Sequence, residues 1–327
     1  MGSNYTNTLA GMLLLNDQNM ADIYPNGVLD DSPVIAQASA VAASQGTVHK
    51  YLRRTTAATV GFREINTGVT NTAEIFDDIS HTLKILDASF TRDVALADAF
   101  RAGREAYIQK ETQAALKSGM FALETALFGF GQSTQFAGLP YFVEYADTDY
   151  GDQVIDAGGA GGKSVWLIRW GEDAVSVIAG NDGNMSMLWD DDNPTVVQVY
   201  QSDQGVTAPY SAYRVTLQGY FGLQVASVYD VVRIANLDGT SDDLLTDDLI
   251  SDALSVFPAA RPPNMICMNR TALKELQQSR TARNPTGAPA PFPEESFKIP
   301  IVTTDALGSS EVEIDATTTT TTTSSSV

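Results

Sequence analysis

The sequence predicts an α+β fold in which a single long helix accompanies a strand-rich region, and three observations lead to it. Residues 92–128 carry the clearest helical pattern. Residues 46–90 and 139–239 contain short β-prone runs separated by turn residues, and an α–β–α unit follows the second region. With 327 residues, of which 43% are hydrophobic, the chain is long and apolar enough to bury a sizeable core.

The first 45 residues predict an extended arm. Short apolar runs alternate there with Ala, Ser, Asn and Asp, and no amphipathic period extends beyond a short helix expected near 33–44. An arm that cannot bury its own apolar residues usually lies on a neighbouring surface. The run LAGMLLL at 9–15 is short and no Lys or Arg precedes it, so we expect no signal peptide. Because no run of eighteen apolar residues exists, we also expect no membrane span.

Residues 46–90 predict a long two-stranded excursion. The runs VHKYLRR, TVGFREI and SHTLKIL are β-prone, and NTGVTNT at 66–72 is a turn cluster. Neither strand supplies many large apolar side chains, so the hairpin has no core of its own and must lean on another surface.

Residues 92–128 predict a helix about 55 Å long. Thr91 is the expected N-cap and Gly129 the expected stop. Gly103 and Gly119 are the positions where a bend is expected. One apolar stripe recurs every seven residues, at Phe100, Tyr107, Ala114, Phe121 and Phe128.

The rest of the chain alternates strands with turn residues and then adds the α–β–α unit. The expected strands are SVWLIRW, AVSVIAG, TVVQVYQ, YRVTLQGYFGLQVA and DVVRIANL. Thr246 is the expected cap of the helix DDLISDALSVF, NMICMN a buried strand, and Asn269 the cap of RTALKELQQS. A late strand lies in FKIPIVTTDAL, and the tail ATTTTTTTSSSV is too low in complexity to join a core.

Residue types that carry catalysis are scarce. The chain has two histidines, His49 and His81, and one cysteine, Cys267, which sits in an apolar run and is expected to be buried and unreactive. Gly162-Lys163-Ser164 looks like the end of a phosphate-binding loop, but a strand pattern follows it where such a loop needs a helix. We therefore predict no catalytic residues, no cofactor and no enzyme activity.

Acidic residues dominate the chain, whose net charge is −20. Residues 138–260 hold nineteen acidic side chains against four basic ones and should repel a phosphate backbone. Two carboxylate clusters, at 190–192 and at Asp242, Asp243, Asp247 and Asp248, lack the ligand spacing of an EF-hand. We read them as a solvated turn and a helix start, and assign no metal site.

One basic cluster stands out in this acidic chain. Lys50, Arg53 and Arg54 lie close together in the excursion, and Arg63 follows them. Pairing with the acidic surface of another copy of the chain explains this asymmetry better than nucleic-acid binding, which needs more basic and stacking residues. With His81 as a surface or interface histidine, these five residues are the predicted intersubunit contacts. The residues by themselves indicate a self-associating protein.

The order of elements resembles the major capsid proteins of tailed bacteriophages with the Hong Kong 97-type fold. HKYLRRTTAATVGFREINTGV is similar to the start of the E-loop, and ALADAF with ETALFGFGQSTQFAGLPYF to the spine helix and its exit. The stretches VIDAGGAGGKSVWLIRWGEDAVSVIAG and AYRVTLQGYFGLQVASVYDVVRIANLD resemble the body of the epsilon 15-like subgroup. MICMNRTALKELQQSR and IPIVTTDAL resemble the A-domain helix and the closing P-domain strand.

The resemblance, which covers roughly residues 45–310, implies a division of the chain. The expected parts are an N-terminal arm (1–45), an E-loop (46–90), a P-domain with the spine helix (91–138), an A-domain with associated strands (139–296), a returning P-domain strand (297–315) and a low-complexity tail (316–327).

The resemblance also implies a function. Homo-pentamers and homo-hexamers would tile an icosahedral shell around double-stranded DNA, which the chain would contact non-specifically at most. A separate scaffolding protein, a portal and a decoration protein are the expected partners, with assembly in the host cytoplasm and a final location in the virion. The alternatives are an encapsulin-like compartment shell, an acidic cation-dependent binding module, and an extracellular adhesin, against which the absence of internal repeats speaks.

Overall fold

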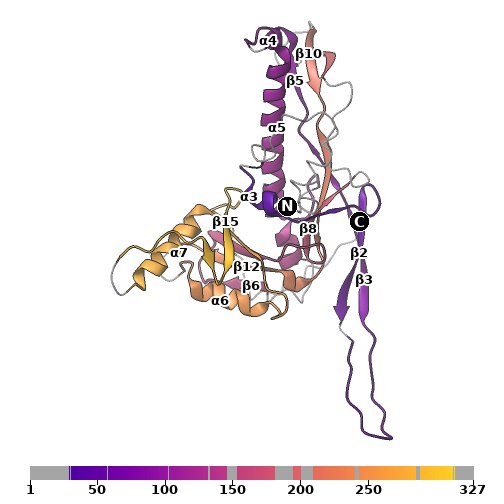
Figure 1. Cartoon of the computed structure of the whole chain (residues 1–327), viewed down its shortest axis with the longest axis vertical. Coiled ribbons are helices and arrows are strands. Elements are labelled where there is room, and N and C mark those ends of the chain that lie inside the picture. The colour runs from indigo at the N-terminus through magenta and orange to yellow at the C-terminus, as the bar shows by residue number, and fades with distance from the viewer. Residues whose placement is uncertain are drawn as a thin grey trace, which may run out of the picture.

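The computed structural model describes residues 29, 31–56, 58–101, 103–131, 133–145, 153–180, 194–199, 209–239, 243–284, 288–311 and 313. These parts form an α+β molecule of extended shape. In Figure 1 the long helix α5 (Arg104–Leu127) stands at one end, and the hairpin of β2 (Val48–Thr56) and β3 (Ile75–Thr82) points away from it at the other. A sheet with helices α6 (Asp247–Val256) and α7 (Arg270–Ala282) projects to the side.

That lateral sheet has six strands in the order β14-β15-β13-β7-β12-β6. The strands span, in the same order, Glu295–Ser296, Ile299–Thr303, Met265–Met268, Lys163–Ile168, Val231–Leu237 and Val154–Asp156. Every residue of β13, β7 and β12 is buried, including the polar Lys163, Ser164, Arg233 and Asn236, so both faces of these strands are covered.

Alternation along β7 divides the core in two. Val165 and Leu167 pack with the residues of α6 and α7, whereas Trp166 and Ile168 belong to the cluster that includes α5. Successive side chains of a strand point to opposite faces, so one strand serves both clusters. Strand β7 therefore connects the core beneath α6 and α7 to the core around α5.

Two smaller sheets accompany α5. Strands β1 (Ala40–Ala42), β8 (Val175–Ala179), β11 (Gln218–Val225) and β4 (Lys84–Asp87) form a four-stranded sheet in that order. Strands β5 (Phe90–Asp93), β10 (Tyr210–Val215) and β9 (Thr195–Val199) form a three-stranded sheet, and Figure 1 shows β5 and β10 beside the far end of α5. The short helices η1 (Tyr141–Tyr145) and η3 (Val228–Asp230) lie in connections.

The strands expected between 139 and 239 and the α–β–α unit are confirmed, with the end of TVVQVYQ lying outside the described residues. The run YRVTLQGYFGLQVA divides into β10 and β11. Thr246 accepts a hydrogen bond from the Leu249 amide (3.3 Å) and Asn269 accepts one from the Ala272 amide (2.8 Å), so both are the predicted caps. The late strand β15 lies parallel to β13 within the six-stranded sheet. No helix in the part of the chain that the structure describes is long and apolar enough to cross a membrane.

The long helix is interrupted at Gly103, one of the two glycines where a bend is expected. The break separates α4 (Val94–Asp98) from α5, and the φ of +97° at Gly103 suits glycine. The cap and the second glycine differ from the prediction. Asp93, not Thr91, caps α4 by accepting a hydrogen bond from the Ala95 amide at 2.8 Å. Gly119 sits inside α5 without interrupting it.

The predicted apolar stripe of this helix was wrong. Ala114 is exposed, and the aromatic members of the stripe are only half-buried. The buried face instead carries Ile108, Leu116, Met120, Leu123 and Leu127. A seven-residue repeat drifts by about 20° per heptad around a straight helix, so a stripe sustained over four heptads cannot remain on one face.

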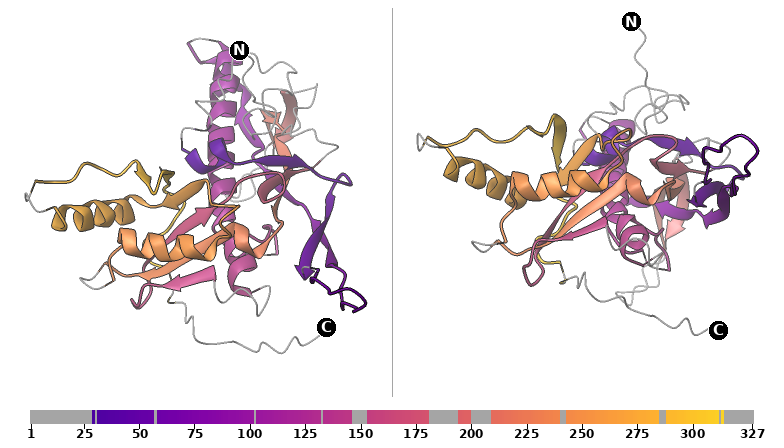
Figure 2. Two further views of the ribbon diagram at one scale, coloured as in Figure 1. Left: turned by 60° about the horizontal axis from the view of Figure 1, so that its bottom comes forward. Right: turned by 90° about the horizontal axis from the view of Figure 1, so that it is seen from below.

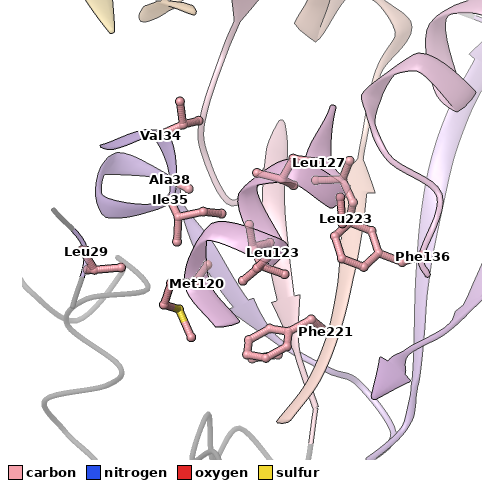
Figure 3. Packing of buried hydrophobic residues seen from close by; sticks show 14 of the residues in the cluster. Leu29, Val34, Ile35, Ala38, Met120, Leu123, Leu127, Phe136, Phe221 and Leu223 are labelled. Atoms are coloured by element: carbon pink, nitrogen blue, oxygen red, sulfur yellow. The ribbon is translucent and has the colours of Figure 1, made fainter. Parts of the chain in front are cut away.

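Part of the predicted arm is built into the subunit. Helix α3 (Pro33–Gln37) is shorter than the helix expected near 33–44, and β1 follows it and pairs in parallel with β8. Figure 3 shows Val34, Ile35 and Ala38 packed beside Met120 and Leu123 of α5. These residues cover this chain's own core and not a neighbouring surface, whereas residues 1–28 lie outside the described residues.

A buried carboxylate on α5 explains where the arm begins to pack. Glu124 is fully buried and accepts hydrogen bonds from the amides of Val34 (3.0 Å) and Ile35 (3.1 Å). The Thr304 hydroxyl, just after β15, donates to the other carboxylate oxygen. Helix starts leave amides unpaired, and here a side chain pairs them. Burial raises the pKa of Glu124 above its usual range.

Candidate assembly interface

The β2–β3 hairpin is the most isolated part of the described chain. Its strands pair antiparallel from Val48–Thr82 outward, and a single bridge, Thr59 to Thr72, joins the extended segment 58–74 beyond them. Figures 1 and 2 show this hairpin extending away from the body of the molecule. A two-stranded ribbon without a covering layer is marginally stable by itself. The predicted two-stranded excursion is confirmed for 48–82. The run TVGFREI forms no strand beyond the bridge at Thr59, and SHTLKIL divides between β3 and β4, which pairs with β11 of the body.

The extended segment presents apolar side chains to solvent. Val60, Phe62 and Ile65 are 84%, 107% and 91% exposed, so the described part of the subunit leaves them uncovered. Large apolar side chains gathered on an exposed element mark a surface that another molecule covers. We call these three residues the tip triad. Sequence reasoning missed them, although three large apolar residues within a turn-rich segment were a usable signal.

The root of the hairpin is fastened to the body through His49. This side chain is buried, and its Nε2 lies 2.8 Å from Oε1 of Gln224 on β11. The Ser44 amide donates to Nδ1 at 3.3 Å, and the Gln224 amide group donates to the Glu172 carbonyl at 3.1 Å. Because Nδ1 accepts, Nε2 is the nitrogen that donates a hydrogen bond to Gln224.

Tyr51 and His81 complete the root. The Tyr51 ring lies between the two imidazoles, with centroid distances of 5.8 Å to His49 and 5.7 Å to His81. Its hydroxyl donates to the Val225 carbonyl at 3.3 Å, and His81 meets the edge of Phe142 at 5.6 Å. Burial is the main cause that lowers the pKa of His81, and the neighbouring His49 lowers it further. His81 thus lies half-buried against the body of its own subunit.

The predicted basic contacts are spread along the hairpin. Lys50 is exposed on β2 opposite Ser80, and Arg63 is exposed in the extended segment, where its Nη1 donates to the Thr67 carbonyl at 3.3 Å. In the strand register, Arg53 lies opposite Asp77, and Arg54 opposite Phe76. The structure describes only the backbone of Arg53 and Arg54, so their contact role stays a prediction.

The second carboxylate cluster is used for ion pairs. Asp247 accepts two hydrogen bonds from Arg280, at 2.7 and 2.8 Å, and Asp248 pairs with Arg283. Hydrogen bonding to Arg280 is the main cause that lowers the pKa of Asp247. Residues 190–192 and Asp242 lie outside the described ranges. Within those ranges no group of three or more His, Cys, Asp or Glu side chains could hold a metal ion.

The phosphate-loop-like sequence is structural. Lys163 begins β7 and forms a buried ion pair with Glu275 of α7, so its ammonium group lies inside the protein and not at the surface. The Ser164 hydroxyl donates to Glu311 at 2.7 Å. The single cysteine, Cys267, is fully buried as predicted, and burial raises the pKa of its thiol well above the usual range.

Sequence reasoning also missed a buried arginine. Arg233 of β12 lies over the Trp166 ring at 5.0 Å and donates to Glu311 at 2.6 Å. Glu311 forms a backbone bridge with Gly162, so this contact ties the last described residues to the six-stranded sheet. A lone Arg inside the apolar run VVRIAN was the available signal, since a buried charge needs a partner.

The family model described as major capsid protein GP7 matches residues 17–315. No curated protein matches the chain significantly.

Three solved structures illustrate the structural likeness. A chain of bacteriophage Epsilon15 is 20% identical, with a TM-score of 0.57, covering 84% of this chain and 87% of that one. The capsid of bacteriophage JBD30 is 10% identical (TM-score 0.46; 82% and 88% covered). An encapsulin complex, SrpI of Synechococcus elongatus PCC 7942, is 8% identical (TM-score 0.37; 62% and 86% covered). The likeness to Epsilon15 shows a shared fold, whereas the other two scores are too low to support a conclusion.

Proposed function

The chain belongs to the major capsid protein GP7 family, and we propose that its copies form pentamers and hexamers that tile an icosahedral shell around the double-stranded DNA of a tailed phage. The Hong Kong 97-type fold expected from the sequence is the one shared with the Epsilon15 chain. In this proposal the β2–β3 hairpin with its extended segment is the E-loop, and α5 is the spine helix.

The exposed E-loop is the observation that carries this proposal. Its tip triad is uncovered within one subunit, while its root is fastened by buried hydrogen bonds from His49 and Tyr51. A firmly rooted element with an uncovered apolar end fits a contact that is completed by a second copy. Lys50, Arg53, Arg54 and Arg63 accompany the triad as the charged part of that contact, and His81 supports it from the root.

The remaining parts of the chain keep the boundaries that the family resemblance implies. Residues 1–45 form the N-terminal arm, 91–138 the P-domain with the spine, and 139–296 the A-domain with associated strands. Residues 297–315 return to the body, with β15 paired to β13, and 316–327 form the tail. Strands β8 and β11, which fall inside 139–296, lie in the sheet that packs on α5.

Assembly in the host cytoplasm with a separate scaffolding protein, a portal and a decoration protein completes the proposal. DNA is contacted non-specifically at most, since the net charge of −20 disfavours a phosphate backbone. Family membership favours a phage shell over an encapsulin-like compartment. The pairing of Asp247 and Asp248 with arginines removes the main support for a cation-dependent module. The role is structural and not enzymatic.

Electron microscopy of the full chain tests this function directly. We expect closed polyhedral shells, or sheets of rings, with co-expressed scaffolding protein. A variant with Val60→Ser, Phe62→Ser and Ile65→Ser should stay folded, because all three side chains are exposed, but should form no shells. A wild-type chain that remains monomeric under every condition would overturn the proposed function. Wild-type shell yields from the triple variant would overturn the E-loop contact.

A further inference from the structure

The turn between β14 and β15 has an unusual backbone. Ser296 pairs with Ile299, so Phe297 and Lys298 are the two central residues of a two-residue hairpin loop. Both have positive φ, +51° and +66°. This is the pattern of a type I′ turn, in which Asn-Gly is the preferred pair because neither residue is strained there.

Phe297 and Lys298 are poor choices for that geometry. A β-carbon makes the left-handed region unfavourable, and only Gly and, less readily, Asn or Asp adopt it routinely. The other non-glycine residues with positive φ in the described ranges are both asparagines, Asn66 and Asn236. Strained backbone of this kind persists where the surroundings hold it, and it concentrates at functional surfaces.

The base of the turn is held from behind. Ser296 is buried and its hydroxyl donates to Asp247 at 2.8 Å. Asp247 in turn accepts a hydrogen bond from Arg280, whose guanidinium also donates to the Glu295 carbonyl at 3.3 Å. Residues from α6, α7 and β14 therefore meet in one hydrogen-bonded group. This group fixes where the turn points.

The turn itself faces solvent. Phe297 is 54% exposed and Lys298 is exposed, although Phe is among the residues that gain most from burial. In the isolated subunit, this turn thus combines a strained backbone with an uncovered aromatic ring. The cost of the uncovered ring is removed only when another surface receives it.

We propose that Phe297 and Lys298 form a preorganised anchor that inserts into the surface of a second copy of this chain. This proposal rests on the proposed shell function, in which every subunit is surrounded by identical copies. A protruding anchor on one copy and a receptive surface elsewhere on the next make a head-to-tail contact, the type that closes rings. Lys298 suits an acidic receiving surface, and the net charge of −20 makes such a surface common on this chain.

Rigid aromatic side chains commonly dominate binding between proteins. The hydrogen bonds behind Ser296 keep the turn in one conformation before contact, so little ordering cost remains when a partner binds. This contact is separate from the E-loop, because β14 and β15 lie at the edge of the six-stranded sheet.

A turn-replacement variant separates anchoring from folding. Phe297→Asn with Lys298→Gly installs the preferred type I′ pair and removes the ring. We expect the melting temperature of the unassembled subunit to rise by a few degrees, while the concentration needed for shell assembly rises at least about tenfold. Phe297→Ala removes the ring but leaves residues with a β-carbon at both positive-φ positions. It should therefore raise the assembly concentration without raising the melting temperature.

Phe292→Ala is the matched control. Phe292 lies on the connection between α7 and β14, just before the turn, is 64% exposed, and has no positive φ, so its truncation should leave assembly unchanged. Assembly of both Phe297 variants at the wild-type concentration would overturn the proposal and leave the turn to another partner. If Phe292→Ala raised the assembly concentration equally, the assignment of the contact to the turn would be overturned. If the wild-type chain forms no shells, the proposed function itself fails.

Discussion

His49 and His81 are direct cross-strand partners at the root of the β2–β3 hairpin, and they are the only two histidines of the chain. Nδ1 of His49 accepts the Ser44 amide hydrogen, and Nε2 of His49 donates to Gln224. His81 lies half-buried beside it, and burial lowers the pKa of His81, so protonating His81 places a charge where burial favours a neutral ring. The attachment of the hairpin is consequently sensitive to acid.

A loss of stability on mild acidification is the first prediction. The pKa of His81 is lowered in the folded state from the usual 6.5. The unfolded chain then binds the proton first, so the stability contributed by His81 is present above pH 6.5 and is lost as the pH falls below it. Melting curves of the unassembled subunit between pH 7.5 and 5 should show this decline.

The control is His81→Gln, which cannot titrate and should flatten the pH dependence. Glu124 works in the opposite direction, because its raised pKa stabilises the folded state at low pH, so the comparison between His81→Gln and wild type isolates the histidine. Identical pH profiles for the two proteins would contradict the prediction.

Glu124 should be essential as a hydrogen-bond acceptor and not as a charge. Glu124→Gln keeps one oxygen for the amides of Val34 and Ile35 and should cost about 1 kcal/mol or less. Glu124→Ala leaves both buried amides unpaired and opens a cavity, which we expect to cost about 3 kcal/mol or more. Denaturant unfolding measures both values. Equal destabilisation by the two substitutions would show that the charge itself matters.

The ion pair of Lys163 with Glu275 provides a third prediction. Both side chains are at most 10% exposed, so removing one partner leaves a buried charge unpaired. Lys163→Met and Glu275→Leu should each destabilise the subunit by about 3–5 kcal/mol, whereas the double replacement should cost much less. A double-mutant cycle by denaturant unfolding tests this. Additive losses would mean that the two groups do not interact.

Charge reversal on the hairpin should disrupt assembly. Arg53→Glu with Arg54→Glu removes the predicted basic contacts, and we expect shells to be absent or aberrant in electron micrographs. The melting temperature of the unassembled subunit should stay near wild type, since β2 carries little of the core.

Arg101→Glu with Lys110→Glu is the matched control for net charge. Both residues are exposed and lie outside the hairpin, so this variant should still assemble. Normal shells from the Arg53/Arg54 variant would remove these two residues from the interface.

Short-range sequence pattern was sufficient to predict most strands and helices. The strands β7, β8, β9 and β12 and the caps Thr246 and Asn269 follow from β-branched runs and capping side chains that are close in sequence. The buried face of α5 did not follow, because it is chosen by the sheets that pack on the helix and not by the helix itself.

Of the predicted contact residues, Lys50 and Arg63 lie exposed on the hairpin, whereas His81 faces the body of its own subunit. That orientation depends on Tyr51 and Phe142, which are distant from His81 in sequence. The tip triad shows the reverse case. Its composition was informative, but only the three-dimensional arrangement revealed that no described segment of the subunit covers it.

By itself, the sequence determined the α+β class, the order of elements and the resemblance to a shell protein, since each depends on short-range pattern and chain order. Only the tertiary structure decided which charges are buried. The pairs Lys163–Glu275 and Arg233–Glu311 and the acceptor role of Glu124 join residues 78 or more positions apart. The strained turn at Phe297 and Lys298 also belongs to the structure, because hydrogen bonds from two helices hold a conformation that its own residues disfavour.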